Sequence, residues 1–154
     1  MHSNLEIVVG ISYTEKGHKF ATTIMKTYDY KNLTPESALE IEPYKITEKG
    51  HGGSTDVGDI SWIRTTTEIG AATWMPGTGA NSWQAVAAGG TSIGEKGMIV
   101  AIKTLTLTAI DLFKNPDIIE KADKELVKRR GTNFVYKALL GDRNPPLDYR
   151  LNKK

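Results

Sequence analysis

The sequence predicts a single domain of the α/β class, with helices beside at least one strand. Two segments have clear helical patterns, residues 93–113 and the segment that begins at Pro116. Residues 65–75 instead have the threonine, isoleucine and tryptophan content of a strand, which should end at Pro76. The length of 154 residues suits one domain with a hydrophobic core. We therefore expect one domain over residues 1–154.

Two threonines predict helix starts in the first third of the chain. Thr14 is a suitable N-cap for a helix of about twelve residues. Thr34 precedes Pro35, and proline is favoured at the first helical position, so a short helix is expected there. Residues 1–13 contain a short apolar run that fits either a strand or the last turn of a helix.

The helix expected over residues 93–113 is strongly apolar. Ser92 and Glu95 have the spacing of a capping box, which predicts its start. Its apolar positions recur at intervals of three and four and extend nearly all round, so we expect a central buried helix. They are Met98, Ile99, Val100, Ile102, Leu105, Leu107, Ala109, Ile110 and Leu112. The alternation of residues 102–108 also fits a strand, and this alternative stays open.

The next helix has the clearest boundaries in the chain. Asn115 and Pro116 predict its start, and Gly131 can close it in a left-handed conformation. Basic residues suit its C-terminus because they complement the helix dipole. Its apolar residues lie on one side and its charged residues on the other, as in an amphipathic surface helix.

A glycine-rich stretch over residues 51–83 is where we expect a functional site. It begins with a turn that leads into a short helix, and residues 76–82 form a loop. It also contains all three tryptophans, Trp62, Trp74 and Trp83. These side chains could face an aromatic ligand, although burial in a core is the commoner fate of tryptophan.

The composition excludes several classes of function. There is no cysteine, which rules out disulfides, thiolate catalysis and metal sites built on thiolates. The formal net charge is +2 and no long basic block occurs, so nucleic acid is a poor candidate as partner. No signal peptide and no membrane span is indicated, and a cytoplasmic location is expected.

A complete metal or nucleotide site cannot be assembled from the motifs present. There are three histidines, of which only His51 lies in an interesting place, next to two glycines; a loop residue is the commoner reading of such a histidine. Neither HxD nor HExxH occurs, and no two glutamates are adjacent. The segment 89–96 has Glu95 where a phosphate-binding loop needs glycine.

The turn formed by Gly52, Gly53, Ser54, Thr55 and Asp56 is the best candidate for binding. Small residues there expose backbone N–H groups and two hydroxyls ahead of a helix, and such a turn can hold a carboxylate or phosphate. Ser54, Thr55 or Asp56 could equally serve only as a cap of the following helix. The residues alone leave these two interpretations about even.

Two segments of this stretch carry a resemblance to a known family. GGSTDVGDISW over residues 52–62 and TWMPGTGANSWQAVAAGGTSIGEKGM over residues 73–98 resemble the C-terminal part of metallohydrolases of the M20 peptidase family. Residues 4–24 and the helices from Asn115 onward are similar to it as well. The resemblance covers nearly all of this chain but only the last third of a family member.

The resemblance implies an α/β fold: a C-terminal fragment of a zinc-peptidase-like catalytic domain, with a mixed sheet flanked by helices. It implies amide cleavage of acylated amino acids by a two-metal zinc centre in the intact family. The N-terminal part, which supplies most metal ligands and the catalytic glutamate, has no counterpart here. No catalytic residue is therefore assigned, while Gly53, Ser54, Thr55 and Asp56 are implied as substrate contacts.

The last metal ligand of the family is a histidine in a Gly-His-Ser-Trp-like setting. The matching position in this chain is Asn81, whose neutral amide is a much weaker ligand for zinc than imidazole. An asparagine in a glycine-rich loop is also an ordinary turn residue, which is the commoner reading. We therefore expect this chain alone to bind no zinc.

Two hypotheses of function follow. In the first, the chain is the C-terminal piece of an amidohydrolase, inactive alone, whose partner is the N-terminal half of the hydrolase or a second copy. In the second, it is a non-catalytic subunit that binds the acyl amino acid or a partner. A fragment should also leave apolar surface exposed, so self-association is expected.

Overall fold

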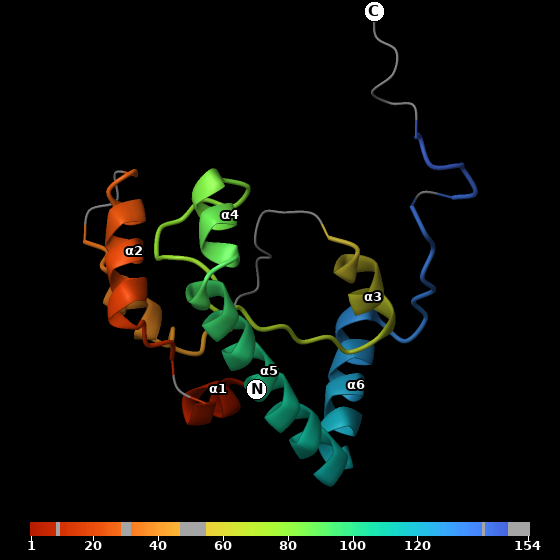
Figure 1. Cartoon of the computed structure of the whole chain (residues 1–154). Helices are drawn as coiled ribbons and strands as arrows, with labels where there is room; N and C mark the ends of the chain where they lie inside the picture. The colour runs from red at the N-terminus through yellow and green to blue at the C-terminus, as the bar shows by residue number, and fades with distance from the viewer. Residues whose placement is uncertain (9, 29–31, 47–54, 140, 148–154) are drawn as a thin grey trace, which may run out of the picture. The chain divides into compact units, whose positions relative to one another are not determined.

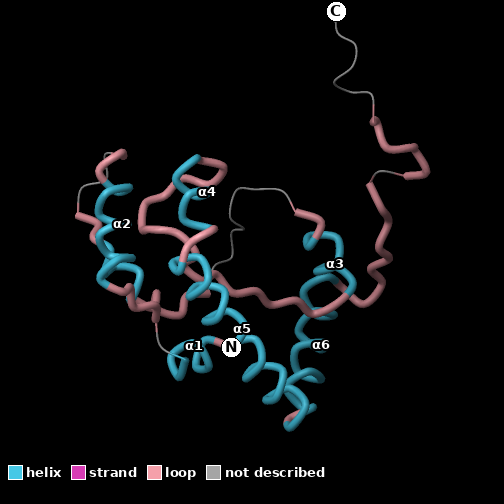
Figure 2. Tube along the Cα trace, viewed as in Figure 1, coloured by secondary structure: helices cyan, strands magenta, loops and turns pink. Residues whose placement is uncertain are grey.

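The computed structural model of the chain describes residues 1–8, 10–28, 32–46, 55–139 and 141–147. The elements in these ranges are helices (Figure 1): α1 His2–Val8, α2 Glu15–Met25, the 3-10 helix η1 Pro35–Leu39, α3 Val57–Ile63, α4 Trp83–Gly89, α5 Ser92–Lys114 and α6 Pro116–Arg130. Figure 2 shows helix and loop but no strand among the described residues. The predicted α/β class, with a mixed sheet flanked by helices, is therefore wrong for this part of the chain.

The strand predicted over residues 65–75 is replaced by irregular backbone. Within the described ranges, no backbone group of residues 67–73 is hydrogen-bonded to another backbone group. A strand needs a neighbouring strand that pairs with its N–H and C=O groups. The composition of this segment favours the conformation of a strand, but no described segment offers the partner.

The contacts divide the chain into two compact units. Unit 1 consists of Met1–Gly50 and Thr67–Pro116, and unit 2 of His51–Thr66 and Asp117–Lys154. Each unit has its own packing. That residues 1–154 form a single domain stays a prediction.

The hydrophobic core of unit 1 is small and combines four segments. Its buried members are Ala21 and Ile24 of α2, Met75 of the loop, Ala88 of α4 and Ile93 of α5. Partly buried aromatic residues, Tyr13, Phe20 and Tyr28, pack against them together with Met25. The helix expected after Thr14 thus packs on the core with one apolar face, which carries Phe20, Ala21, Ile24 and Met25.

The predicted helix starts at the two threonines are confirmed. The Thr14 hydroxyl accepts a hydrogen bond from the backbone N–H of Gly17 at 3.1 Å, as an N-cap residue should. Thr34 and Pro35 begin a short helix, which is of the 3-10 type, and the Thr34 N–H donates to Ser37 Oγ at 3.3 Å. The undecided first segment forms the helix α1.

Helix α5 follows the prediction closely in its length. It includes residues 102–108, so the strand alternative for these residues is wrong. Its N-cap is Thr91, whose hydroxyl accepts from the N–H of Ile93 at 3.2 Å, rather than Ser92 as the capping-box spacing indicated. Thr91 takes this role because its backbone is extended, which is the conformation that an N-cap requires.

The burial of α5 differs from the prediction of a central buried helix. Its buried residues are Ile93, Gly94, Gly97, Thr104 and Thr108, most of which are small or polar. Several of its large apolar side chains are exposed instead, among them Met98, Ile102 and Leu105. The prediction is wrong because an apolar helix is buried all round only where other elements cover every side.

Glycine allows two close approaches to α5. A Cβ atom on Gly97 would lie 2.3 Å from the carbonyl oxygen of Ala72, and one on Gly94 would lie 2.5 Å from that of Gly89. Such distances are far below van der Waals contact, so no side chain fits at either position. The segment that contains Ala72 and the C-terminal end of α4 therefore lie directly against the helix.

A buried polar contact joins α1 to α5. The Asn4 amide donates to Thr108 Oγ1 at 3.2 Å and to Asp111 Oδ2 at 2.7 Å. Thr108 in turn donates to the carbonyl oxygen of Thr104 at 2.8 Å. Buried polar groups are tolerated when they are hydrogen-bonded in this way, so the contact holds α1 in a defined position.

Unit 2 is built around α3 and α6. Thr65 Oγ1 donates to Asp123 Oδ1 of α6 at 2.6 Å, and the Arg130 guanidinium donates to the carbonyl oxygen of Trp62 at 2.7 Å. Trp62 stacks on Phe134 with ring centroids 5.2 Å apart. The predicted helix from Pro116 is confirmed, and Gly131 follows it with a positive φ of 87°.

No helix in the described residues is long and apolar enough to cross a membrane.

We expect Gly97→Ala to destabilise the protein by about 1–3 kcal/mol, because the added methyl group would overlap the backbone of Ala72 and Thr73. Urea denaturation followed by circular dichroism measures this change. Gly89→Ala is the matched control, since a Cβ atom at Gly89 meets nothing within 4 Å. An equal midpoint for the two variants would show that the close approach at Gly97 does not constrain the fold.

Candidate functional site

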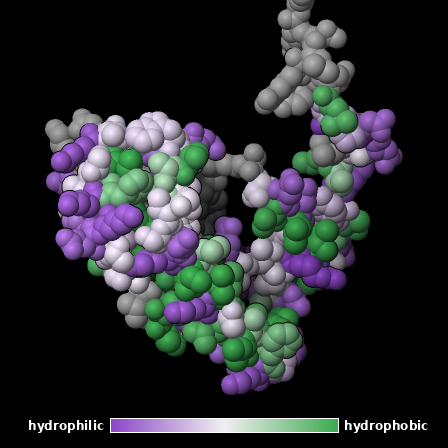
Figure 3. Space-filling model, in the orientation of Figure 1, coloured by the Kyte–Doolittle hydropathy of each residue, from purple (hydrophilic) through white to green (hydrophobic). Residues whose placement is uncertain are grey.

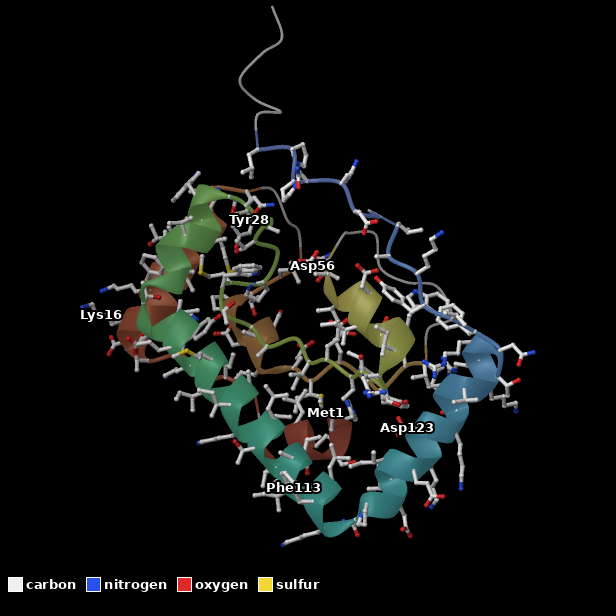
Figure 4. All side chains as sticks on the ribbon, turned by 90° about the vertical axis from the view of Figure 1, so that its right-hand side faces the viewer. Met1, Lys16, Tyr28, Asp56, Phe113 and Asp123 are labelled. Atoms are coloured by element: carbon white, nitrogen blue, oxygen red, sulfur yellow. The ribbon has the colours of Figure 1, made fainter. Side chains whose placement is uncertain are left out.

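The predicted binding turn is described only in its second half. Gly53 and Ser54 lie outside the described residues, as does His51. Thr55 and Asp56 are exposed and directly precede α3 (Figure 4, where Asp56 is labelled). That these four residues contact a substrate therefore stays a prediction.

The described half of the turn has the geometry of a helix start. Thr55 Oγ1 accepts a hydrogen bond from the N–H of Val57 at 3.3 Å, and the carbonyl oxygen of Thr55 accepts from Gly58 at 3.2 Å. Asp56 occupies the N-cap position, but its side chain makes no capping hydrogen bond. Thr55 thus takes part in starting α3, while the carboxylate of Asp56 caps no backbone donor of the helix.

Asn81 lies in the loop between Met75 and α4. It is exposed and has a positive φ of 61°, a conformation that asparagine tolerates better than most residues. The next residue, Ser82, is the N-cap of α4, and its hydroxyl accepts from the N–H of Ala85 at 3.2 Å. This geometry is that of a turn residue, which is one of the two readings of Asn81.

The described residues do not fit a zinc site. Among them no three histidine, aspartate or glutamate side chains gather closely enough to hold a metal ion. His18 is engaged instead with Glu36, at 2.6 Å between Nε2 and Oε1, and His2 lies 3.5 Å from Glu6. No chemical step through zinc can therefore be derived from this part of the chain.

The three tryptophans are exposed rather than buried. Trp62, Trp74 and Trp83 expose 50%, 38% and 58% of their surface. The commoner reading, that they belong to a core, is thus wrong for this structure. Trp62 belongs to unit 2, whereas Trp74 and Trp83 belong to unit 1. Part of each ring is therefore accessible, although the Trp62 ring is stacked on Phe134.

A hollow of unit 1 has a volume of about 340 Å³. Its lining includes the apolar residues Leu5, Ile11, Ile69 and Val100 and the exposed residues Glu40, Glu42 and Glu68. The lining residues come from four distant parts of the sequence. No local motif marks such a site, which is why the sequence did not reveal it.

A pair of titratable groups joins α2 to η1. His18 contacts Glu36, and both side chains are about half exposed. A hydrogen bond from the Thr34 side chain, followed by bonds from the backbone and from His18, lowers the pKa of Glu36. Nearby, burial and to a smaller degree Tyr28 raise the pKa of Tyr13 to about 12. Neither group lies close to the predicted turn in the sequence.

Two features of unit 1 were missed by the sequence analysis. No helix was predicted where α4 lies, although Ser82 is a suitable N-cap and helix-forming residues follow it. The contact of His18 with Glu36 has no sequence signal, because the two residues are 18 positions apart. Pairs of this kind become visible only when the elements pack.

Comparisons with known proteins give one similarity. No family model matches the sequence, and no solved structure matches it. The chain is 36% identical over 100 residues to one of the subunits of p-aminobenzoyl-glutamate hydrolase from Escherichia coli strain K12. The aligned part is 65% of this chain but 21% of that protein, so the chain spans about a fifth of the relative's length.

This similarity confirms the resemblance in its specific form. The residues that carry the resemblance are similar to those of the p-aminobenzoyl-glutamate hydrolases, and the comparison finds a subunit of such a hydrolase. The chain is thus related in sequence to a hydrolase. Membership of the M20 family itself stays a prediction.

The depressed pKa of Glu36 gives a testable expectation. Thr34→Val should raise the pKa of Glu36 toward its ordinary value more than His18→Gln does, because the Thr34 hydrogen bond is the largest cause. A depressed carboxylate pKa stabilises the fold above the unfolded pKa, and this contribution is lost as pH falls through the folded pKa. An NMR titration of the Glu36 carboxyl measures both shifts; a larger effect of His18→Gln would contradict the assignment.

Proposed function

We propose that this chain corresponds to the C-terminal part of an amidohydrolase similar to the p-aminobenzoyl-glutamate hydrolases, and that it works together with the remaining part of such an enzyme. The observation that carries the proposal is the similarity to one subunit of that hydrolase, of which the chain spans only 21%. The substrate class is an acylated amino acid with an amide bond to be cleaved. The expected location is the cytoplasm.

Unpaired backbone in unit 1 supports the need for a further part. Residues 67–73 contain half-buried positions, Ile69, Ala71 and Ala72, yet the backbone of this segment has no hydrogen-bond partner among the described residues. At these exposures water can still reach the backbone, but a part that packed on the segment would bury it, and buried backbone N–H and C=O groups are nearly always paired in native proteins. A further part of the enzyme that packs here would supply partners for these groups.

The metal-ligating side chains suggest how this chain and the remaining part of the enzyme divide the work. In the proposal, the metal ligands and the catalytic glutamate come from the remaining part, since the described residues offer no ligand set. When bound, zinc would supply an activated water and a polarised carbonyl group. This chain contributes the turn of Gly53, Ser54, Thr55 and Asp56, whose hydroxyls and backbone N–H groups suit a carboxylate of the substrate.

A second candidate is a non-catalytic subunit that binds the acyl amino acid or a partner protein. The exposure of all three tryptophans favours it, because tryptophan is enriched in binding surfaces and its ring can stack on an aromatic amide. The first candidate predicts that a reconstituted mixture cleaves the substrate, and the second predicts binding without cleavage. Binding of p-aminobenzoyl-glutamate by the chain alone, without cleavage in any mixture, would favour the second.

The first test is reconstitution. We expect the purified chain alone to leave p-aminobenzoyl-glutamate intact, because it lacks a ligand set among its described residues. Mixing it with the complementary N-terminal part of the hydrolase and zinc should give amide cleavage, measured as release of p-aminobenzoate. Continued inactivity of a mixture that demonstrably assembles would sink the proposal.

A substitution at Thr55, measured in the same assay, tests whether the turn of residues 53–56 contacts the substrate. Thr55→Val should raise the KM of the reconstituted enzyme about 3- to 10-fold, because it removes one hydroxyl from the substrate region. The matched control is Thr66→Val, since Thr66 is exposed and its hydroxyl donates only to the nearby carbonyl oxygen of Arg64. If Thr55 serves only to start α3, stability would fall while KM stays unchanged.

Metal content gives an independent prediction. We expect neither the wild type nor Asn81→His to bind zinc tightly and stoichiometrically when purified alone, because one imidazole does not make a site. Atomic absorption after dialysis, beside isothermal titration with zinc, measures this. In the reconstituted enzyme Asn81→His should instead raise zinc affinity. Tight zinc in the isolated wild type would contradict the proposed division of roles.

A further inference from the structure

Helix α5 turns its large apolar side chains away from the core of unit 1. Phe113 is 88% exposed, and five other large apolar residues of this helix are between 42% and 53% exposed: Met98, Ile99, Ile102, Leu105 and Ile110. Figure 3 shows hydrophobic atoms gathered along this helix, and Figure 4 labels Phe113 near its C-terminal end. We call these six residues the α5 stripe.

The middle of the stripe lies opposite the buried side of the helix, and Leu105 lies at the edge of the stripe, about 60° from Thr108. Successive residues of an α-helix are turned by about 100°, which puts Thr104 and Thr108 on one side and Ile102 and Phe113 on the other. Thr104 is fully buried and Thr108 nearly so. The helix therefore buries a small and polar face and exposes a broad apolar one, the reverse of an ordinary surface helix.

Apolar residues along one side of α5 have the spacing with which two helices pack against each other. Met98, Ile102, Leu105, Ala109 and Leu112 follow one another at intervals of four, three, four and three residues. This is the a/d pattern with which one helix packs its side chains between those of another. A flat sheet or a small ligand requires no such repeat, so the pattern points to a helix as the occupant.

The charges allow an identical helix as the partner. Between Met98 and Phe113, no charged residue lies on this a/d line or directly beside it, where Thr106 and Phe113 flank one edge and Ala101 and Thr108 the other. Lys103 is turned about 160° away from Leu105 on the helical wheel. Two copies of α5 can therefore meet without repulsion between like charges, which otherwise sets partner choice in helix pairs.

The exposed area is sufficient for such a pair. On the helical wheel Ile99 and Ile110 are turned about 100° and 120° away from the middle of the a/d line, so Met98, Ile102, Leu105 and Phe113 are the stripe residues that a paired helix can cover. At their exposures of 53%, 49%, 47% and 88% these four side chains present on the order of 450 Å² per copy, and two copies would bury about 900 Å² in total, close to the lower bound for a specific interface. A patch of this size is about as large as the largest apolar patch of a typical monomer, and such a patch often serves as an interaction surface. Since the same helix exists on every copy, a second copy is the partner that is always present.

We propose that two copies of this chain associate through their α5 stripes, as a symmetric pair of helices with Leu105 at its centre. Leu105 lies midway between Met98 and Phe113, so it faces its own counterpart whether the helices run parallel or antiparallel. The inference goes beyond the proposed function and does not depend on it. It assigns an interaction surface and its occupant.

Sedimentation of the purified chain at several concentrations is the first test. We expect a dimer, and Leu105→Glu should raise its dissociation constant at least about 100-fold, because two carboxylates would enter the apolar contact. Lys103→Glu is the matched control and should leave the dimer intact. A monomeric wild type, as when α6 of the same chain covers the stripe, would overturn the proposal, as would polydisperse aggregates.

A cross-linking experiment does not depend on how well the charged variant folds. The chain has no cysteine, so Leu105→Cys introduces a single thiol at the proposed centre. Mild oxidation should convert most of this variant into a disulfide-linked dimer, whereas Lys103→Cys should remain without a cross-link on a non-reducing gel. Equal cross-linking of the two variants would mean random collision and would refute the assigned surface.

Discussion

The close approach of Ala72 to α5 at Gly97 is the constraint on which the structure of unit 1 depends. Because a Cβ atom at Gly97 would meet the carbonyl oxygen of Ala72 at 2.3 Å, only glycine lets the two backbones lie in contact. The contact leads the chain to Met75, which is fully buried in the core with Ile93. It also requires that the small side of α5 faces inward, and the large apolar side chains are consequently directed outward.

This arrangement leaves unit 1 with few large side chains in its interior. Met75, Ile93 and Thr104 are its largest fully buried side chains, and the α1 contact depends on hydrogen bonds from Asn4 rather than on apolar packing. A chain with an exposed apolar helix face and an unpaired backbone segment has surfaces suited to further protein contacts. Its similarity to a subunit of a much longer hydrolase agrees with such contacts.

The candidate site was accessible to sequence reasoning only in its local features. The helix start at Thr55 and Asp56 and the turn at Asn81 could be recognised because cap and turn residues are properties of neighbouring residues, while the substrate contacts of Gly53, Ser54, Thr55 and Asp56 stay a prediction. The exposure of the three tryptophans could not be recognised, since it depends on which distant segments cover them. For the same reason the hollow of unit 1, with lining residues from four distant segments, had no signal in the sequence.

The sequence by itself determined the helices with strong end signals, those at Thr14, Thr34, Pro116 and Gly131, and the relation to a hydrolase. These features depend on hydrogen bonds and backbone preferences within a few residues, which neighbouring side chains decide. Only the tertiary structure decided that residues 67–73 form no strand and which side of α5 is exposed. Strand pairing and burial require atoms from distant segments, and their presence cannot be read from local sequence.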